Sequence, residues 1–148
     1  MLSTELSQDE LMRTCRNGDM EGVKVFITEF GAKAVFSETD GDNMNCFQSS
    51  IYVKNANFTW LLLQNGADPN DYTGDTFVLT RASGQGTSAH VEILLAYGAK
   101  ADNDDSRALY AVSGKRPFGD KEQKILRLLL QNGADPNGVN KHGTAGTI

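Results

Sequence analysis

Hydrophobic and polar positions follow the same order several times along the chain. Each time, large apolar residues spaced as on one face of a helix lead into Gly-Ala, and polar turn residues follow. The Gly-Ala pairs begin at positions 31, 66, 98 and 133, so they lie 35, 32 and 35 residues apart. The ten residues at 61–70 return unchanged at 128–137. Repetition with this period predicts stacked structural units.

Each copy predicts a helix that ends at its glycine. Glycine adopts the left-handed conformation that closes a helix C-terminus without a Cβ clash. In the two identical copies Asp-Pro-Asn follows, and Pro69 and Pro136 lack the N–H group that a continuing helix needs. Proline also moves the preceding residue toward extended geometry. We therefore expect each unit to consist of a helix, a glycine stop and an extended turn.

A further helix is predicted in front of each of these. The first covers 7–17, with Ser7 as the N-cap and Glu10 as its capping-box partner, and Val23 to Ile27 lie in the helix that follows. In the later units we expect inner helices at 45–50, 77–83 and 107–113, and outer helices at 58–63, 90–97 and 125–132. The connection at 114–120 is longer than a tight turn requires.

These units resemble the ankyrin repeat, in which a turn leads into Thr-Pro-Leu-His and small residues on an inner helix, and a Val- and Leu-rich outer helix ends in Gly-Ala. Residues 11–23 are similar to the polar-faced N-terminal capping repeat of that family, and Asn-Cys-Phe-Gln-Ser-Ser at 45–50 occupies the Thr-Pro-Leu-His region. Leu79, Ala82 and Ser83 occupy the leucine and small-residue positions of the third unit. The second unit replaces the Thr, Pro and His, and the segment 114–120 is an insertion relative to the family.

The resemblance covers nearly the whole chain and implies a single all-α domain, an ankyrin-like repeat solenoid of about four helix-turn-helix repeats with projecting turns. The repeats extend approximately over 1–31, 32–66, 67–98 and 99–133, with a partial fifth at 134–148. The expected core residues are Leu11, Met12, Val25, Ile27, Phe47, Leu61, Leu63, Leu79, Ala82, Ile93, Leu95, Leu109, Leu126 and Leu129. The fourth repeat lacks the polar C-terminal cap of the family, which favours fraying or self-association through that repeat.

Composition and charge narrow the class of protein. The 148 residues are 39% hydrophobic and 22% charged, which is typical of one soluble folded domain. A formal net charge of −5 argues against binding to nucleic acid or to an anionic membrane, and it favours a partner with a basic segment. The N-terminus is not leader-like and no apolar run has membrane-spanning length, so we expect an intracellular, cytoplasmic protein, with the nucleus as an alternative location.

Residues that often carry chemistry have structural interpretations in this chain. Cys15 and Cys46 fall at apolar helical positions, which favours reduced core thiols over a disulfide or a metal pair. His90 and His142 lie in different units, which favours packing or surface roles over a catalytic group. The glycine-rich segments do not match phosphate-binding motifs. We therefore expect no cofactor, no metal and no catalytic residue.

Candidate binding residues lie in the turns and inner helices, where the copies differ from one another. Repeats share their core residues by necessity, so divergence marks positions that the architecture leaves free. Tyrosine, phenylalanine and arginine are also enriched at protein interfaces. The candidates on this concave side are Tyr52, Tyr72, Asp75, Phe77, Arg81, Asp105, Arg107 and Tyr110. Tyr110 falls in the family's buried His position, where it is either a core residue or a binding residue.

Acidic residues gather in the same turns. Stacking of equivalent turns would place these carboxylates side by side as an acidic ridge. One interpretation is solubility and turn formation, since aspartate bonds its own backbone in turns. The other is that the ridge recognises a basic segment of a partner. Its members are Glu38, Asp40, Asp42, Asp71, Asp75, Asp102, Asp104 and Asp105.

These features predict a non-enzymatic protein-interaction module that binds a partner protein through its concave face. The alternative is a small enzyme that uses the groove as a pocket, with Asp75 or Asp105 as acid or base, Tyr110 as proton donor and Arg107 as anion clamp. A third interpretation is an array that masks the surface of another protein. Trp60 lies on an outer helix and would be the anchor if the outer helices formed the recognition face.

Overall fold

The computed structural model describes residues 6–137, except for the side chains of Asp104 and Asp105. Within this range the chain forms nine α-helices and one short 3-10 helix, and its extended structure is confined to one isolated bridge between Thr39 and Asn45. The all-α class predicted from the sequence is confirmed for these residues. The partial fifth repeat expected at 134–148 lies outside the described residues from position 138 onward.

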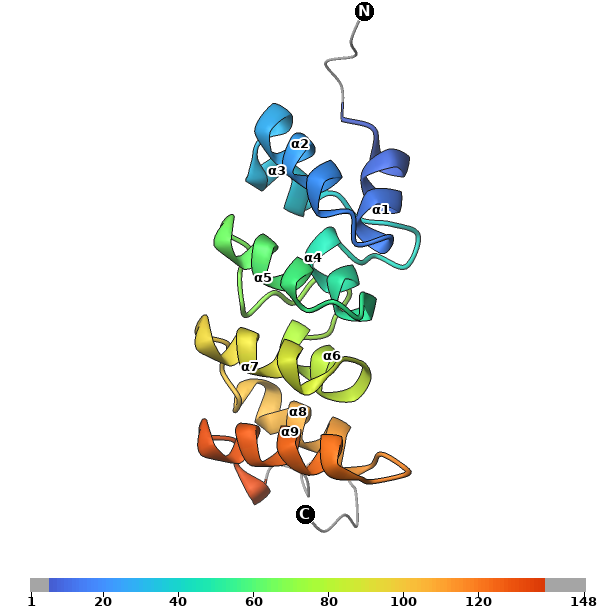
Figure 1. The fold of residues 1–148 in the computed structure, drawn as a ribbon. Coiled ribbons are helices and arrows are strands. Elements are labelled where there is room, and N and C mark those ends of the chain that lie inside the picture. The colour runs from blue at the N-terminus through green and yellow to red at the C-terminus, as the bar shows by residue number, and fades with distance from the viewer. Residues whose placement is uncertain (1–5, 138–148) are drawn as a thin grey trace, which may run out of the picture.

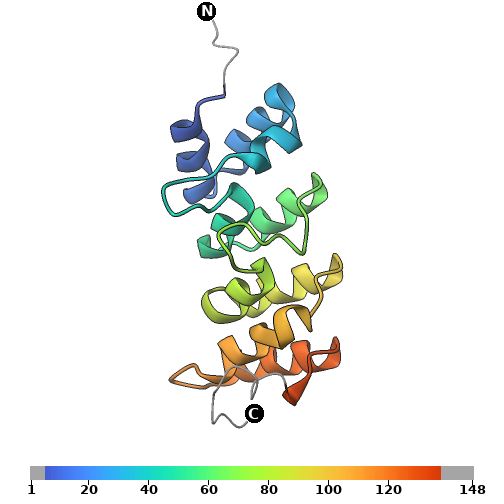
Figure 2. The same ribbon diagram turned by 180° about the vertical axis from the view of Figure 1, so that it is seen from behind.

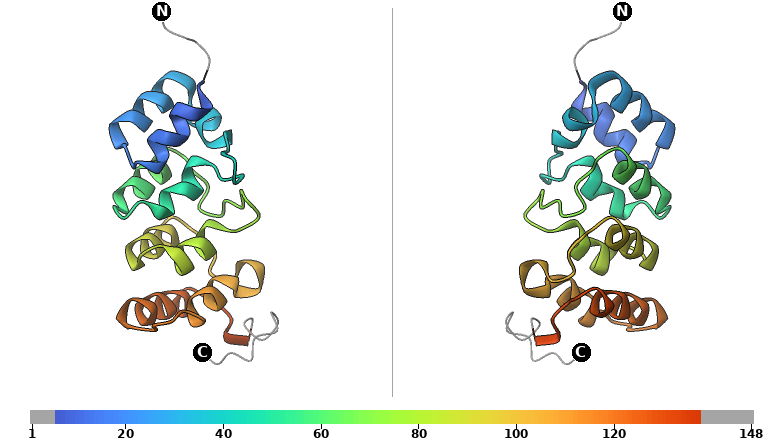
Figure 3. Two further views of the ribbon diagram at one scale, coloured as in Figure 1. Left: turned by 90° about the vertical axis from the view of Figure 1, so that its right-hand side faces the viewer. Right: turned by 90° about the vertical axis from the view of Figure 1, so that its left-hand side faces the viewer.

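The elements follow one another in chain order from one end of the molecule to the other (Figures 1 and 2). They are α1 (Gln8–Arg16), α2 (Met20–Phe30), α3 (Ala32–Ser37), α4 (Cys46–Ser49), the 3-10 helix η1 (Ser50–Tyr52), α5 (Asn57–Gln64), α6 (Val78–Gln85), α7 (Ser88–Ala96), α8 (Asn103–Ser113) and α9 (Asp120–Gln131). The helices α1, α4, α6 and α8 form an inner row in which each packs against the next, and α5, α7 and α9 form an outer row beside it. The connections at 38–45 and 67–77 lie on the same side of the stack (Figure 3).

Three outer helices end as the repeated Gly-Ala pairs predict. Gly66, Gly98 and Gly133 have positive φ angles of 98°, 100° and 100°. At the first of them, the Gly66 N–H donates to the Leu63 carbonyl and the Ala67 N–H donates to the Leu62 carbonyl, each over 3.1 Å. The other two copies make the same pair of bonds. This arrangement pairs the last carbonyls of each helix and requires the left-handed glycine.

Gly31 also ends its helix with a positive φ, but the first unit differs from the prediction after this glycine. Its φ of 89° is combined with a ψ of 149°, and α3 begins at the next residue. No Asp-Pro-Asn follows Gly31, and the next residues are Ala-Lys-Ala-Val-Phe, which can form a helix. The extended turn is therefore replaced by a second short helix, which buries Val35 against the core.

Helix starts are fixed by polar contacts that the sequence reveals in part. Ser7 is the N-cap of α1, as predicted, and its hydroxyl accepts from the Glu10 N–H. α8 begins at Asn103, four residues before the predicted start at 107, and its buried residue Ser106 has a φ of 63°. α9 begins five residues earlier than the predicted start at 125, because the Glu122 side chain reaches back to accept from the Gly119 N–H over 2.9 Å.

The core lies between the inner and outer rows. Of the residues predicted for it, Leu11, Met12, Phe47, Leu61, Leu63, Leu79, Ala82, Leu109 and Leu129 are buried, and Ile27, Ile93, Leu95 and Leu126 are partly buried against it. Val25 is a wrong prediction, since it is 61% exposed. It follows the fully buried Val23 by two residues, which is about half a helical turn, and therefore faces the other side of α2.

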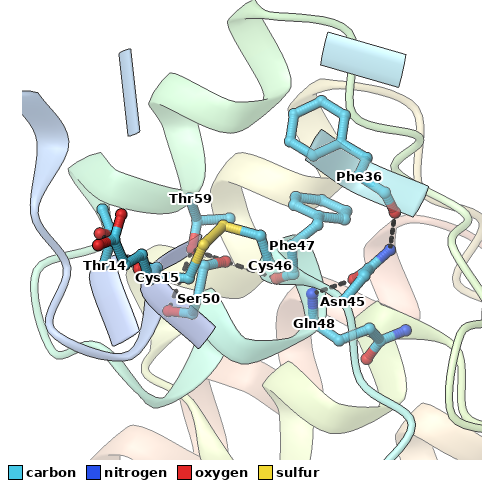
Figure 4. The surroundings of a disulfide bond; sticks show 10 residues. Thr14, Cys15, Phe36, Asn45, Cys46, Phe47, Gln48, Ser50 and Thr59 are labelled. Carbon is cyan, nitrogen blue, oxygen red and sulfur yellow. Dashed lines mark hydrogen bonds between the residues drawn. A yellow bond between two sulfur atoms is a disulfide. The ribbon is translucent and has the colours of Figure 1, made fainter. Parts of the chain in front are cut away.

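The two cysteines correct a second prediction. Cys15 on α1 and Cys46 at the start of α4 form a disulfide, with their Cα atoms 5.4 Å apart and both side chains fully buried (Figure 4). Their apolar positions are as expected, but packing of α1 against α4 brings two sulfur atoms together that lie 31 residues apart in the chain. Disulfides persist mainly in oxidising compartments, so this bond does not support the intracellular location, which stays a prediction.

His90 is a packing residue, in agreement with its predicted role, and it is held in one neutral form. The Thr87 N–H donates to His90 Nδ1 over 3.1 Å, so Nδ1 acts as an acceptor. The proton therefore lies on Nε2, which is 3.0 Å from the Val53 carbonyl and donates to it. Burial lowers the pKa of His90 below 6.5, although hydrogen bonds to the carbonyls of Val53 and Ser50 partly oppose this change.

The stability of the fold should therefore fall as the pH drops below about 6.5. The unfolded chain binds a proton at His90 that the folded chain resists, because protonation of Nδ1 removes the acceptor for Thr87. This contribution is fully present above the unfolded pKa and is lost progressively as the pH falls toward the lowered folded pKa. Urea unfolding at about pH 7.5 and pH 5.5 measures it. His90→Gln should flatten this dependence of the free energy of unfolding on pH, and an equal dependence in the wild type and the variant would contradict this assignment.

Candidate functional site

A buried glutamine fixes the turn that joins the second and third units. Gln48 on α4 is fully buried, and its Nε2 donates to the Thr76 carbonyl over 2.8 Å and to the carbonyl and Oδ1 of Asp71, each over 3.1 Å. Asn45 Nδ2 donates to Asp71 Oδ2 over 2.9 Å and to the Phe36 carbonyl over 3.1 Å. Asp71, a member of the predicted acidic ridge, is thus an internal acceptor that holds the turn.

The same glutamine places a candidate arginine. Arg81 on α6 is half-buried, and its Nε donates to Gln48 Oε1 over 2.7 Å. Its Nη1 donates over 3.1 Å to the hydroxyl of Tyr52, whose side chain is 51% exposed. Arg81, a predicted binding residue, is therefore exposed over only part of its side chain. Arg81 thus connects the buried hydrogen-bond network around Gln48 to Tyr52 at the surface.

An aromatic pair lies at the projecting turn before α6. Tyr72 is 48% exposed, and its ring packs against Phe77 with centroids 4.6 Å apart at an interplanar angle of 63°. Gly74 and Asp75 have positive φ angles of 77° and 61°, and the Asp75 N–H donates to the Tyr72 carbonyl over 3.1 Å. The turn thus holds Tyr72 in a defined orientation and leaves the Asp75 side chain exposed.

The remaining candidates lie one inner helix further along the stack. Arg107 and Tyr110 belong to α8, which packs against α6. Arg107 is exposed, whereas Tyr110 is half-buried and contacts the core, so its role in packing is observed and its role in binding stays a prediction. The Asp105 side chain lies outside the described part of the structure. The structure therefore joins Tyr52 to Arg81 and Tyr72 to Phe77, with Arg107 and Tyr110 on the adjacent helix.

A cavity of about 490 Å³ lies between α1, the 38–45 connection and α4, and sequence reasoning did not identify it as a site. It is lined by Arg16, Asp40, Gly41, Asp42, Met44, Ser49 and Tyr52. The Gln8 side chain donates to the Thr39 carbonyl and holds the connection against α1. The sequence signal was the turn-forming Asp-Gly-Asp-Asn at 40–43, but only the fold brings it beside α1.

An aromatic pair on the outer row was also missed. Trp60 Nε1 donates to the Tyr97 hydroxyl over 3.0 Å, and the two side chains are 43% and 39% exposed. Tyr97 occupies the position held by Asn65 and Asn132 in the identical copies, where each asparagine donates to a carbonyl of its own helix. The replacement of the repeated asparagine by Tyr97 was the feature of the sequence that could have indicated this pair. The pair makes the outer row a competing recognition face.

No protein-family model matches the chain. No helix within residues 6–137 combines the length and the apolar character needed to cross a membrane. In the same range no cluster of three or more histidine, cysteine, aspartate or glutamate side chains has an arrangement that could hold a metal ion.

Proposed function

We propose that this chain is an ankyrin-like repeat solenoid that binds a partner protein through its turns and inner helices. The repeated glycine helix stops, the row of inner helices and the parallel row of outer helices support the repeat architecture. The resemblance of the sequence to ankyrin repeats supports the same assignment. In this architecture the projecting turns and inner helices form a continuous surface on which each unit contributes different side chains.

The observation that carries this proposal is the pair of exposed tyrosines that neighbouring side chains hold in place. Tyr52 accepts a hydrogen bond from Arg81, and Tyr72 packs on Phe77. A large aromatic side chain that is already oriented loses little conformational entropy when it enters a partner's pocket. An architecture built for stacking alone does not require either ring at the surface, because both belong to segments that differ between units.

The negative charge of the chain favours a partner protein with a basic surface. The formal net charge of the chain is −5, and exposed carboxylates such as Asp42 and Asp75 lie in the projecting connections. A partner surface with basic side chains would be attracted over distances of about a Debye length and would associate faster at low ionic strength. The enzyme alternative requires Asp75 or Asp105 together with Arg107 and Tyr110 around one pocket, and the described lining of the cavity beside α1 includes neither Asp75, Arg107 nor Tyr110.

Tyr72→Ala in the full chain is expected to weaken the partner complex by about 5- to 100-fold, which corresponds to about 1–3 kcal/mol of binding free energy. The loss arises because the ring is an exposed anchor, and the free energy of unfolding should change little. The partner is first captured with a photo-crosslinking residue in place of Asp75, identified by mass spectrometry and purified. Calorimetric titration then compares the wild type with the variant.

Tyr97→Ala provides the matched control, because it removes a tyrosine of similar exposure from the outer row. The proposal expects this variant to bind the purified partner as the wild type does. If Tyr97→Ala abolished binding while Tyr72→Ala left it unchanged, the recognition face would be the outer row around Trp60. If neither variant changed binding, the tyrosines would not be anchors and the proposed face would be wrong.

A further inference from the structure

The cavity beside α1 opens next to the proposed binding face. Tyr52 belongs to both, since its side chain lines the cavity and its hydroxyl accepts from Arg81. The cavity therefore extends the candidate surface toward the first unit. Its other walls come from the C-terminal end of α1 at Arg16 and from the connection that carries Asp40 and Met44.

The wall of the cavity contains a buried polar group without a partner. Ser49 is 4% exposed, and its Oγ has no hydrogen-bond partner among the described residues. The neighbouring Ser50 hydroxyl is different, because it donates to the Phe47 carbonyl over 2.6 Å. Buried hydroxyls in folded proteins are generally hydrogen-bonded, and an unpaired one costs free energy. A donor group of a bound molecule would remove that cost at Ser49.

The 38–45 connection gives the cavity two carboxylates, and the one of Asp40 is fixed in orientation. Asp40 Oδ1 accepts from the Asp42 N–H over 2.8 Å and from the Met44 N–H over 3.1 Å, which orients this side chain and leaves Oδ2 as a further acceptor. Asp42 is exposed and adds a second carboxylate. Among the described residues that line the cavity Arg16 is the one cationic residue, so these side chains together carry a formal charge of −1 at neutral pH.

We propose that this cavity receives an arginine side chain of the partner protein, an inference that rests on the proposed function. The planar guanidinium stacks on the Tyr52 ring, its aliphatic stem contacts Met44, and its N–H groups donate to Asp40, Asp42 and the Ser49 hydroxyl. Arginine is favoured over lysine because its five donors and flat face match carboxylates and an aromatic wall together. An acidic side chain would instead meet two carboxylates.

The test uses blocked arginine, N-acetyl-arginine methylamide, titrated into the isotope-labelled full chain and followed by NMR. The expected result is a set of amide shifts at 40–44, 49 and 52. The citrulline analogue keeps the shape and lacks the charge, so it should bind at least about tenfold more weakly. Equal shifts from arginine and citrulline, or shifts confined to other residues, would overturn the proposal.

Variants locate the effect in the cavity. Asp40→Asn keeps an Oδ1 acceptor for the turn but removes the charge, and together with Asp42→Asn it should weaken arginine binding by about tenfold. Ser49→Ala should also weaken binding, while urea unfolding remains unchanged or improves because no internal hydrogen bond is lost. Asp120→Asn, an exposed carboxylate on α9 outside the cavity, is the control and should leave the affinity for blocked arginine unchanged. A parallel loss in Asp120→Asn would indicate unspecific charge attraction and would contradict the site.

The purified partner separates this proposal from the function on which it rests. If Tyr72→Ala weakens the complex and Asp40→Asn with Asp42→Asn does not, the interaction module stands and the arginine site is wrong. If blocked arginine binds as expected, and Asp40→Asn with Asp42→Asn weakens the partner complex while Tyr72→Ala does not, the cavity stands and the proposed face around Tyr72 fails. If partner binding is lost both in Tyr72→Ala and in Asp40→Asn with Asp42→Asn, the result supports the proposed face and the arginine site together.

Discussion

Reduction of the disulfide between Cys15 and Cys46 is expected to lower the free energy of unfolding by about 3–4 kcal/mol. The bond closes a loop with a sequence separation of 31 residues and restricts the unfolded chain accordingly. It also joins α1 to α4, so it connects the first unit covalently to the second. Few other interactions in the described part of the chain have an expected effect of this size.

Urea unfolding of the oxidised and the reduced wild type measures this difference, with the transition followed by far-UV circular dichroism. The double variant Cys15→Ala with Cys46→Ala is the control, because reductant should leave its unfolding midpoint unchanged. Thiol titration of the unreduced protein in denaturant should find no free cysteine. Two titratable thiols in the unreduced protein would contradict the expectation. The same urea-unfolding midpoint for the wild type with and without reductant would also contradict it.

The disulfide also bears on the proposed arginine site. Cys15 precedes Arg16 directly, and Cys46 lies one turn of α4 before Ser49, so the bond ties together two walls of the cavity. A mutation that leaves the bond intact and changes only Asp40 or Asp42 therefore tests the site without changing this framework.

Gln48→Ala is expected to lower the free energy of unfolding by about 2–4 kcal/mol, because it removes one donor and one acceptor from a buried network. The Thr76 carbonyl would lose its bond from Nε2, and Arg81 Nε would lose the oxygen to which it donates. Each polar group that stays buried and unpaired costs free energy, whereas an exposed one would be solvated.

Gln64→Ala is the matched control, since Gln64 is an exposed glutamine on α5 and should tolerate alanine within about 0.5 kcal/mol. Chemical denaturation of the two variants under identical conditions measures the difference. Gln48→Ala should also weaken partner binding through the face at Tyr52, because Arg81 loses the contact that orients it. Equal stability of the two variants would show that the network contributes nothing measurable.

Local sequence was sufficient for the units and their ends. A helix stop at Gly66, Gly98 or Gly133 depends on a glycine and on the apolar residues just before it, which are adjacent in the chain. The same local argument gave the Ser7 cap and most of the core. At Gly31 the helix also stops, but the extended turn expected after it is replaced by α3, because the residues that follow can form a helix and no proline prevents them.

Contacts between units could be read from the sequence only in part. Divergence between copies correctly pointed to Tyr52, Tyr72 and Arg81 as residues at or near the surface, because stacking does not dictate those side chains. It could not show that Arg81 is shared between Gln48 and Tyr52, since these residues lie 33 and 29 positions away. A hydrogen bond over such a separation depends on the spacing and rotation of neighbouring inner helices.

The sequence by itself thus determined an all-α chain of recurring helices with glycine stops, an acidic charge and a set of variable surface positions. Tertiary structure alone decided that Cys15 meets Cys46, that Asp71 turns inward to Asn45 and Gln48, and that the 38–45 connection encloses a cavity against α1. The physical reason is the sequence separation between the residues that interact. Helix ends and periodicity depend on residues within a few positions, whereas a disulfide, a buried amide network and a cavity depend on where separate helices are placed in space.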